Sequence, residues 1–257
     1  MQNNFVRPAM KYENEMNRAL ASILSETDIV DIRRLIYSYS NKISILPPAI
    51  SNEFYMMYGR NEEDRKNLFD GIVAKTYSYY LHDWVVDHDI EERVEETQIA
   101  YQFLNEIGSK RLVECPDEVF PYYVDNVVNF IDAMWETRVL EPTVDNYFDI
   151  LDRRACMYKG MFGAAAIAAH ANSGELKLVE SYAMDIYKTS KILDDISDAG
   201  QGERWNLADM IGKEAADSLQ KGHRNRAIEH IRLTSPISDE RKQHKQYLEN
   251  VVHFLYQ

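Results

Sequence analysis

Two short aspartate clusters, far apart in the chain, have a spacing suited to metal chemistry. Asp83 and Asp87 are four residues apart, and so are Asp194 and Asp198, with Asp195 beside the latter pair. On a helix, residues at i and i+4 share a face, where like charges are mildly destabilising. Magnesium binds oxygen ligands and often combines one or two carboxylates with substrate phosphates. The spacing therefore predicts magnesium ligands at Asp83, Asp87, Asp194 and Asp198, with Asp195 in support.

Each cluster alone also has a simpler interpretation as a solvated acidic face. Glu91 and Glu92 follow the first cluster, and Arg204 follows the second, where it could pair with an aspartate or reach a phosphate. The second cluster ends a predicted helix, where the helix dipole disfavours negative charge unless a cation is present. Two such clusters on separate helices indicate a shared metal site more specifically than either does alone.

The elements that must position these clusters are predicted to be helices. The chain has 257 residues, 45% hydrophobic and 28% charged, with only 10 Gly and 7 Pro, and no series of alternating strand patterns. We expect one all-α helical bundle spanning residues 1–257. The expected helices cover 9–25, 28–40, 47–58, 62–107 (with a break near Asp89), 117–138, 144–171, 176–198, 206–231 and 239–256.

Turn and capping signals set the expected helix boundaries. Pro47-Pro48 suits a helix start, and Glu141-Pro142-Thr143 reads as a stop followed by an N-cap. Asn172-Ser173-Gly174 and Gly200-Gln201-Gly202 are expected to end the helices before them.

Composition also excludes several partners. A net charge of −13 argues against nucleic acid, whose binding leaves a basic footprint. The N-terminus is too polar for a signal peptide, and no apolar run is long enough to span a membrane. Cys115 and Cys156 have no metal-binding spacing and suit reduced thiols in a cytoplasmic protein.

At this point the chain resembles the superfamily of trans-isoprenyl diphosphate synthases and class I terpene synthases. The stretch 81–87 looks like the first aspartate-rich motif of that superfamily, with Trp84 in place of its second aspartate. Asp194 to Asp198 matches the second motif, DDxxD, completely, and 158–166 looks like the family's small-residue helix. The resemblance covers roughly residues 65–212 and implies the helical fold of isoprenoid synthases.

Within the superfamily, the strongest resemblance is to the short prenyltransferases of the moenomycin-pathway type. It rests on chain length, on the Ala183-Met184 pair, and on the string Gly202, Glu203, Arg204, Asn206 and Leu207. This type transfers an allylic chain to an acceptor other than isopentenyl diphosphate.

Departures from the chain-elongating members also favour transfer to an acceptor other than isopentenyl diphosphate. Their isopentenyl-binding Gly-Gly-Lys-Arg-x-Arg-Pro string is replaced by 40–47, which holds one lysine and no arginine. The family's diphosphate-contacting Lys-Thr pair is also absent, so Arg153, Arg154 and Lys159 remain alternative candidates for its role. The cyclase form of the second motif fails at Asp198 and Gly202, which favours transfer over cyclisation.

The resemblance implies a three-ion magnesium cluster that holds the diphosphate of an allylic prenyl substrate and promotes ionisation. Other expected substrate contacts are Lys191, Arg204, Asn206, Tyr79 and Trp84. Tyr79, four residues before the first motif, implies a short donor. Tyr77 and Tyr80 could also line the pocket, although aromatic residues at helical spacing usually belong to the core.

Several alternatives stay open. A class I cyclase or a short-chain isoprenyl diphosphate synthase would use the same fold, and a non-catalytic synthase subunit would have lost more aspartates. His82-Asp83 could belong to a metal phosphohydrolase, but no further ligand set accompanies it. Glu-x-x-His motifs of di-iron proteins are absent. The acceptor is undetermined, and the family resemblance suggests a homodimer.

Overall fold

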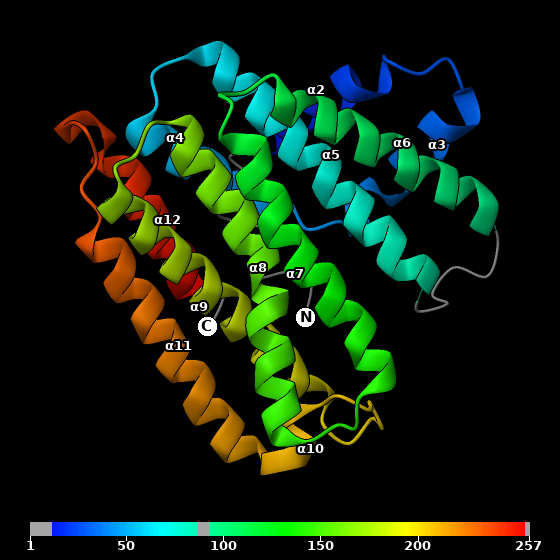
Figure 1. Ribbon diagram of the computed structural model, residues 1–257, viewed down its shortest axis with the longest axis vertical. Helices are drawn as coiled ribbons and strands as arrows, with labels where there is room; N and C mark the ends of the chain where they lie inside the picture. The colour runs from blue at the N-terminus through cyan, green and yellow to red at the C-terminus, as the bar shows by residue number, and fades with distance from the viewer. Residues whose placement is uncertain (1–11, 87–92, 255–257) are drawn as a thin grey trace.

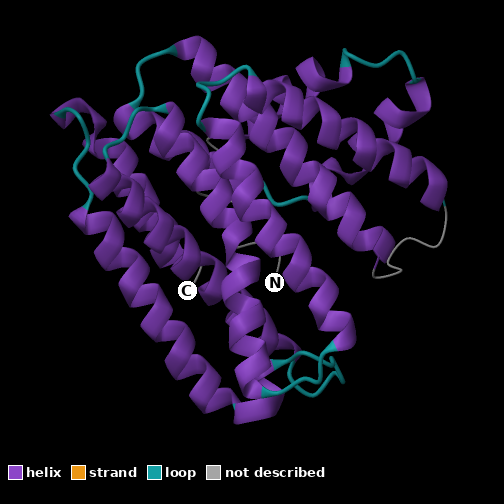
Figure 2. Cartoon of the chain, in the orientation of Figure 1, coloured by secondary structure: helices purple, strands orange, loops and turns teal. Residues whose placement is uncertain are grey.

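All the secondary structure in the computed structural model is helical over the residues it describes, 12–86 and 93–254 (Figure 2). The predicted all-α bundle is confirmed. Within those ranges, no helix is both long and apolar enough to cross a membrane.

Long helices run side by side through the molecule, and shorter ones cover their ends (Figure 1). Their bounds are α2 (Glu13–Leu24), α3 (Val30–Tyr39), η2 (Ser40–Lys42), α4 (Leu46–Tyr58), α5 (Glu62–Val86), α6 (Val94–Val113), α7 (Val119–Val139), α8 (Val144–Ala168), α9 (Ser173–Asp198), α10 (Leu207–Ile211), α11 (Lys213–Leu233), η3 (Asp239–Arg241) and α12 (Lys242–Phe254).

Helix α4 lies at the centre and is buried along almost its whole length. It is apolar on most sides, as expected of a helix enclosed by others. Its first turn carries Pro47-Pro48, as predicted. Phe54 packs edge-on against Tyr182 of α9, with 5.3 Å between ring centroids, and lies 5.9 Å from Phe162 of α8. The main core therefore joins α4 to the helix that bears the second aspartate cluster.

Helices α7 and α8 approach closely because α8 carries small residues, the predicted small-residue helix. A Cβ atom on Gly163 would lie 2.2 Å from the hydroxyl oxygen of Tyr122 on α7. That hydroxyl donates a 2.6 Å hydrogen bond to Glu180 of α9. Gly163 thus permits a contact that ties three helices together.

Several helix boundaries differ from the sequence prediction. The predicted helix 206–231 is divided at Gly212, whose φ of 89° is a left-handed conformation that breaks the helix. Asn172 does not end α8, which stops at Ala168; its side chain instead caps the start of α9 by accepting from the amides of Gly174 and Glu175. Asn suits either role because its side chain can accept from free amides.

The remaining signals agree with the structure. Thr143 caps α8 by accepting from the amide of Asn146, at 3.2 Å. Gly200 and Gly202, with φ of 88° and 84°, follow the end of α9. The predicted break near Asp89 falls within 87–92, which lies outside the described residues, and α6 extends to Val113 rather than ending at 107. The N-terminal helices α2 and α3 add a second apolar cluster against α5 and α6.

Candidate active site

The second aspartate cluster is anchored by Asp195, which is 0% exposed. Its Oδ2 accepts hydrogen bonds from the hydroxyl of Tyr147, at 2.6 Å, and from the amide of Leu207, at 2.9 Å. Its Oδ1 forms a 2.8 Å ion pair with Lys191, one helical turn earlier. Asp195 therefore acts by positioning its neighbours, which fits the supporting role predicted for it.

The loop after α9 is built around this buried carboxylate. The Asn206 side chain donates to the backbone oxygen of Asp195, at 2.8 Å, and caps α10 by accepting from the amide of Asp209, at 3.0 Å. Arg204 donates to the carbonyl of Leu140, at 2.8 Å, and to others at the end of α7. Both side chains thus hold the loop in this structure, and the predicted substrate-binding roles of Arg204 and Asn206 stay predictions.

Asp194 and Asp198 remain to form the outer face of the cluster. Asp194 is exposed, and Asp198 is partly exposed and accepts a 3.2 Å hydrogen bond from Gln201. The pKa of Asp194 is raised to about 6, mainly by desolvation. The charges of Asp195, Asp198 and Glu203 add to the rise, and Lys191 opposes it. Crowded carboxylates of this kind favour a bound cation.

The first cluster approaches the second near Tyr80 of α5. Burial is the main cause of the raised pKa of Tyr80, and the carboxylates of Asp194 and Asp83 both contribute to it. The charges of one carboxylate on α5 and one on α9 thus act on the same phenol, and the shared metal site stays a prediction. Asp87, the other predicted ligand on this side, lies outside the described residues.

Arg154 of α8 brings a positive charge to the same place. Tyr187 of α9 is the largest cause of its raised pKa, through charge and a hydrogen bond, and Asp83 also contributes. Its Nε atom is buried and has no hydrogen-bond partner among the residues that the structure describes. Arg153 also has a buried Nε atom without a partner, so Arg154 is distinguished instead by the charge of Asp83 acting on it.

Lys191 lies in the same group of charges. Burial alone would lower its pKa, but pairing with Asp195 raises it above the usual value, against the opposing charge of Arg154. Its ammonium is therefore kept charged next to Asp194. Of the predicted substrate-binding cations, Arg154 and Lys191 are the two that the structure brings to the clusters.

Arg153 and Lys159, the other candidates for the missing lysine, are used elsewhere. Arg153 forms a two-pronged pair with Glu136 of α7 and a 2.7 Å bond to Asp149. Lys159 lies 3.6 Å from Glu180. Both side chains are engaged by these carboxylates, whereas the charge of Asp83 acts on Arg154. The predicted roles of Arg153 and Lys159 stay predictions.

The two predicted pocket aromatics have different surroundings. Tyr79 forms a 2.6 Å hydroxyl–hydroxyl hydrogen bond with Tyr123 and packs edge-on against Phe130, both on α7. Trp84 instead faces the N-terminal helices, with its ring 5.1 Å from that of Tyr39 and 6.0 Å from that of Tyr80. Tyr79 and Trp84 therefore lie on different sides of α5.

The carboxylates of the two aspartate clusters suit magnesium only in part. No three side chains of the His, Cys, Asp or Glu types lie close enough to hold a metal by themselves in residues 12–86 and 93–254. Asp83, Asp194 and Asp198 nevertheless fit magnesium, which needs only one or two protein carboxylates when phosphate oxygens complete its shell. These residues would hold the ions only together with a diphosphate.

Sequence reasoning missed two tyrosines of the site. Tyr147 and Tyr187 hold Asp195 and Arg154 from positions that belong to no local pattern. It also missed Lys75, buried two turns before Asp83, whose ammonium donates to Asn105 and Ser109 at 2.7 and 2.8 Å. The sequence signal for Lys75 was the presence of a lysine within a largely apolar stretch of α5.

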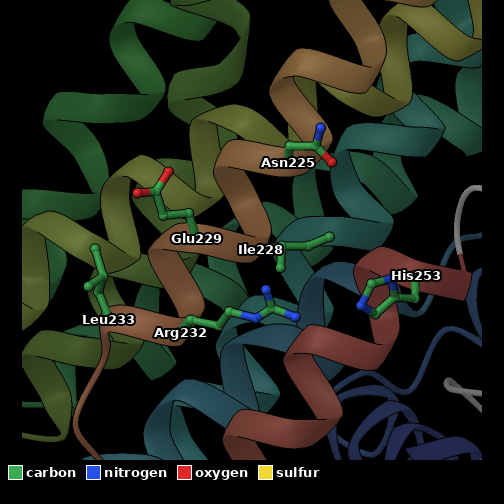
Figure 3. Close-up of a pocket in the computed structure, with 6 residues that line it drawn as sticks. All are labelled: Asn225, Ile228, Glu229, Arg232, Leu233 and His253. Carbon is green, nitrogen blue, oxygen red and sulfur yellow. The ribbon is translucent and has the colours of Figure 1, made fainter.

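A surface groove of about 500 Å³ lies elsewhere, between α11 and α12 (Figure 3). None of the predicted site residues lines it. Its Arg232 is paired with Glu249, at 2.7 Å. The groove therefore has no part in the candidate site. Its lining residues are Asn225, Ile228, Glu229, Arg232, Leu233 and His253.

Solved structures share this arrangement of helices. A geranylgeranyl pyrophosphate synthase from Lactobacillus brevis superposes with a TM-score of 0.80 at 14% identity, covering 98% of this chain and 100% of that one. A geranylgeranyl pyrophosphate synthetase from the archaeon Geoglobus acetivorans gives 0.77 at 13%, covering 99% of each. The chain has the fold of isoprenyl diphosphate synthases. A polyprenyl synthase from Caulobacter crescentus, in complex with calcium and isoprenyl diphosphate, gives 0.77 at 14%, covering 98% and 96%. No protein-family model and no curated protein sequence matches the chain.

Proposed function

We propose that this isoprenyl-synthase-fold protein is a magnesium-dependent prenyltransferase that ionises a short allylic diphosphate. The observation that carries the proposal is the convergence of Asp83 and Asp194, from two helices, on Tyr80. The Caulobacter protein of the same fold holds a divalent cation and an isoprenyl diphosphate, and the moenomycin-type resemblance points to the same chemistry.

The diphosphate would be held by the cations and aspartates beside Tyr80. Arg154 would donate its unused Nε–H to a phosphate oxygen, and Lys191 would neutralise a second one. Asp83, Asp87, Asp194 and Asp198 would hold the magnesium ions, which supply charge neutralisation for the leaving diphosphate. Asp195 keeps Lys191 and the following loop in place without touching substrate.

The donor chain is proposed to lie along α5 toward Tyr79. The bonded hydroxyls of Tyr79 and Tyr123 close the space between α5 and α7. Beneath them the Lys75 ammonium lies 5.6 Å from the centre of the Tyr123 ring. A long apolar tail would have to displace these buried groups and break the hydrogen bond between the two tyrosines, which is costly, and this supports a short donor.

The acceptor is proposed to be something other than isopentenyl diphosphate. The described segment 40–46 carries one cation, Lys42, and no arginine. A second diphosphate would need more positive charge than one exposed lysine supplies. The runner-up is a short-chain isoprenyl diphosphate synthase, favoured by the names of the structural neighbours; a cyclase comes third.

A homodimer is proposed through α7, whose outer face is unusually apolar for a surface helix. The positions recur every three or four residues, and Trp135 and Val139 are 64% and 62% exposed. Trp135→Asp should lower the mass measured by light scattering from dimer to monomer. A monomeric wild type would contradict the interface. The stripe comprises Val124, Val128, Ile131, Trp135 and Val139.

We also propose the cytoplasmic location predicted above. The unpaired thiols of Cys115 and Cys156 support this proposal.

One incubation tests the function. The protein is mixed with magnesium and geranyl diphosphate, with and without isopentenyl diphosphate or a cell extract as acceptor source, and products are identified by mass spectrometry. Transfer to an extract acceptor supports the proposal, a longer diphosphate supports the synthase, and a hydrocarbon supports the cyclase. Absence of any magnesium-dependent turnover would refute all three.

A further inference from the structure

Three aromatic rings and one lysine form a wall beside the candidate site. Trp84 of α5 packs against Tyr39 at the end of α3, with 5.1 Å between ring centroids, and against Tyr80, at 6.0 Å. The ammonium of Lys42, in η2, lies 5.6 Å from the centre of the Tyr39 ring. All three rings are partly exposed and Lys42 is exposed. We call these four residues the aromatic wall.

The aromatic wall adjoins the place where the donor would ionise. Tyr80 belongs both to the wall and to the meeting point of Asp83 and Asp194, and it is hydrogen-bonded to Ser44. Trp84 directly follows Asp83 in the chain. A molecule resting on these rings would therefore lie next to the allylic carbon rather than beside the tail of the donor.

The charge of the wall limits what it can bind. Lys42 makes no ion pair with any carboxylate in the described part of the chain, so its charge is available to a ligand. One exposed ammonium suits one anionic group. The rings offer faces and edges for stacking, a contact that aromatic ligands make better than aliphatic ones.

We propose that the aromatic wall is the acceptor site and that the acceptor is a planar aromatic compound with a single anionic group. The proposal rests on the prenyltransferase function proposed above and names its second substrate class. The anion would pair with Lys42, and the ring would stack on Trp84, Tyr39 or Tyr80. An electron-rich ring is also a competent nucleophile for an allylic cation.

The transfer step balances without any further reagent. The allylic C–O bond breaks, and its electron pair leaves with the diphosphate. A π electron pair of the acceptor ring forms the new C–C bond to the allylic carbon. The ring carbon then loses its proton to a diphosphate oxygen, which restores aromaticity.

A matched pair of acceptors tests the proposal on the intact protein. The probes are 4-hydroxybenzoate and trans-4-hydroxycyclohexanecarboxylate, two six-membered-ring monoanions with the same substituents that differ in aromaticity, with isopentenyl diphosphate as the third. Binding is measured by calorimetry, and products with geranyl diphosphate are identified by mass spectrometry. We expect 4-hydroxybenzoate to bind about tenfold more tightly than its saturated counterpart. Lys42→Met should weaken its binding at least about fivefold, whereas Lys221→Met, on the distant α11, should not.

Equal binding of the two carboxylates, unchanged binding by Lys42→Met, or tighter binding of isopentenyl diphosphate would each overturn the proposal. The proposed function has a separate readout, the magnesium-dependent release of diphosphate from geranyl diphosphate by the wild type with a cell extract as acceptor source. Release without aromatic preference would refute the acceptor assignment alone. Absence of release would refute the function itself.

Discussion

Replacing Asp195 by asparagine should destabilise the protein, although the two side chains have the same shape. The carboxylate is fully buried and accepts from Tyr147 and Leu207 while pairing with Lys191. Asparagine removes the negative charge. With its oxygen kept on Tyr147 and Leu207, which both donate to Oδ2 of Asp195, its NH2 group would face the Lys191 ammonium in place of Oδ1. Lys191 would then be left as a mostly buried charge without its partner.

The magnitude follows from these contacts. Breaking a buried ion pair by removing one partner costs about 3–5 kcal/mol. The lower end applies here because the Lys191 side chain is 24% exposed. At about 2–4 °C per kcal/mol for a domain of roughly this size, the melting temperature should fall by roughly 6–12 °C.

Asp194→Asn is the matched control, one residue away on the same helix. Asp194 is exposed and sits among like charges, so its replacement should leave the melting temperature nearly unchanged. Thermal unfolding followed by circular dichroism, with turnover of geranyl diphosphate on the same samples, separates the two roles. A melting temperature of Asp195→Asn within 2 °C (about 1 kcal/mol) of wild type would refute the positioning role. A melting temperature of Asp194→Asn well below that of the wild type would refute the assignment of a stabilising role to Asp195 and a metal-binding role to Asp194.

Three further predictions concern other charges. Arg154→Met should lower kcat/KM for geranyl diphosphate by about 100-fold, while the adjacent Arg153→Met should change it little; equal effects in steady-state assays would contradict the assignment. Because the pKa of Asp194 is about 6, the magnesium-dependent binding of geranyl thiodiphosphate to the wild type should weaken in calorimetric titrations as the pH drops below 6; an affinity unchanged below that pH would contradict this. Burial lowers the pKa of Lys75 from 10.5 to about 8, so the native state binds fewer protons than the unfolded state between these values. Relative to Lys75→Met, the wild type should therefore gain up to about 3 kcal/mol of unfolding free energy as the pH rises from 8 to 10.5; parallel urea-unfolding profiles would contradict this.

Much of the fold could be predicted because helices leave local signals. Caps such as Thr143 and breaks such as Gly200 depend on neighbouring residues alone. The division at Gly212 was missed because its left-handed φ is set by how α10 packs under α9, not by residues beside it. Asn172 was assigned to the wrong helix because one asparagine suits either kind of boundary.

The candidate site, like the fold, could be predicted from the sequence only in part. The spacing of the aspartates predicted that their two helices share a site, and the charges of Asp83 on α5 and Asp194 on α9 both raise the pKa of Tyr80. Spacing could not separate Arg153 from Arg154, because one helical step decides which of them faces Asp83. Nor could it show that Arg204 and Asn206 hold a loop. The carbonyl of Leu140, which accepts from Arg204, is 64 residues away, and Asp195, which accepts from Asn206, lies on the preceding helix.

The central claim is that two aspartate-bearing helices hold an allylic diphosphate through magnesium. Calorimetric binding of the unreactive analogue geranyl thiodiphosphate tests it most directly, with and without magnesium. Tight binding should require the metal in the wild type and should be lost in both Asp83→Asn and Asp194→Asn, while their melting temperatures stay near wild type. Equal binding without magnesium, or full binding by either folded variant, would contradict the claim.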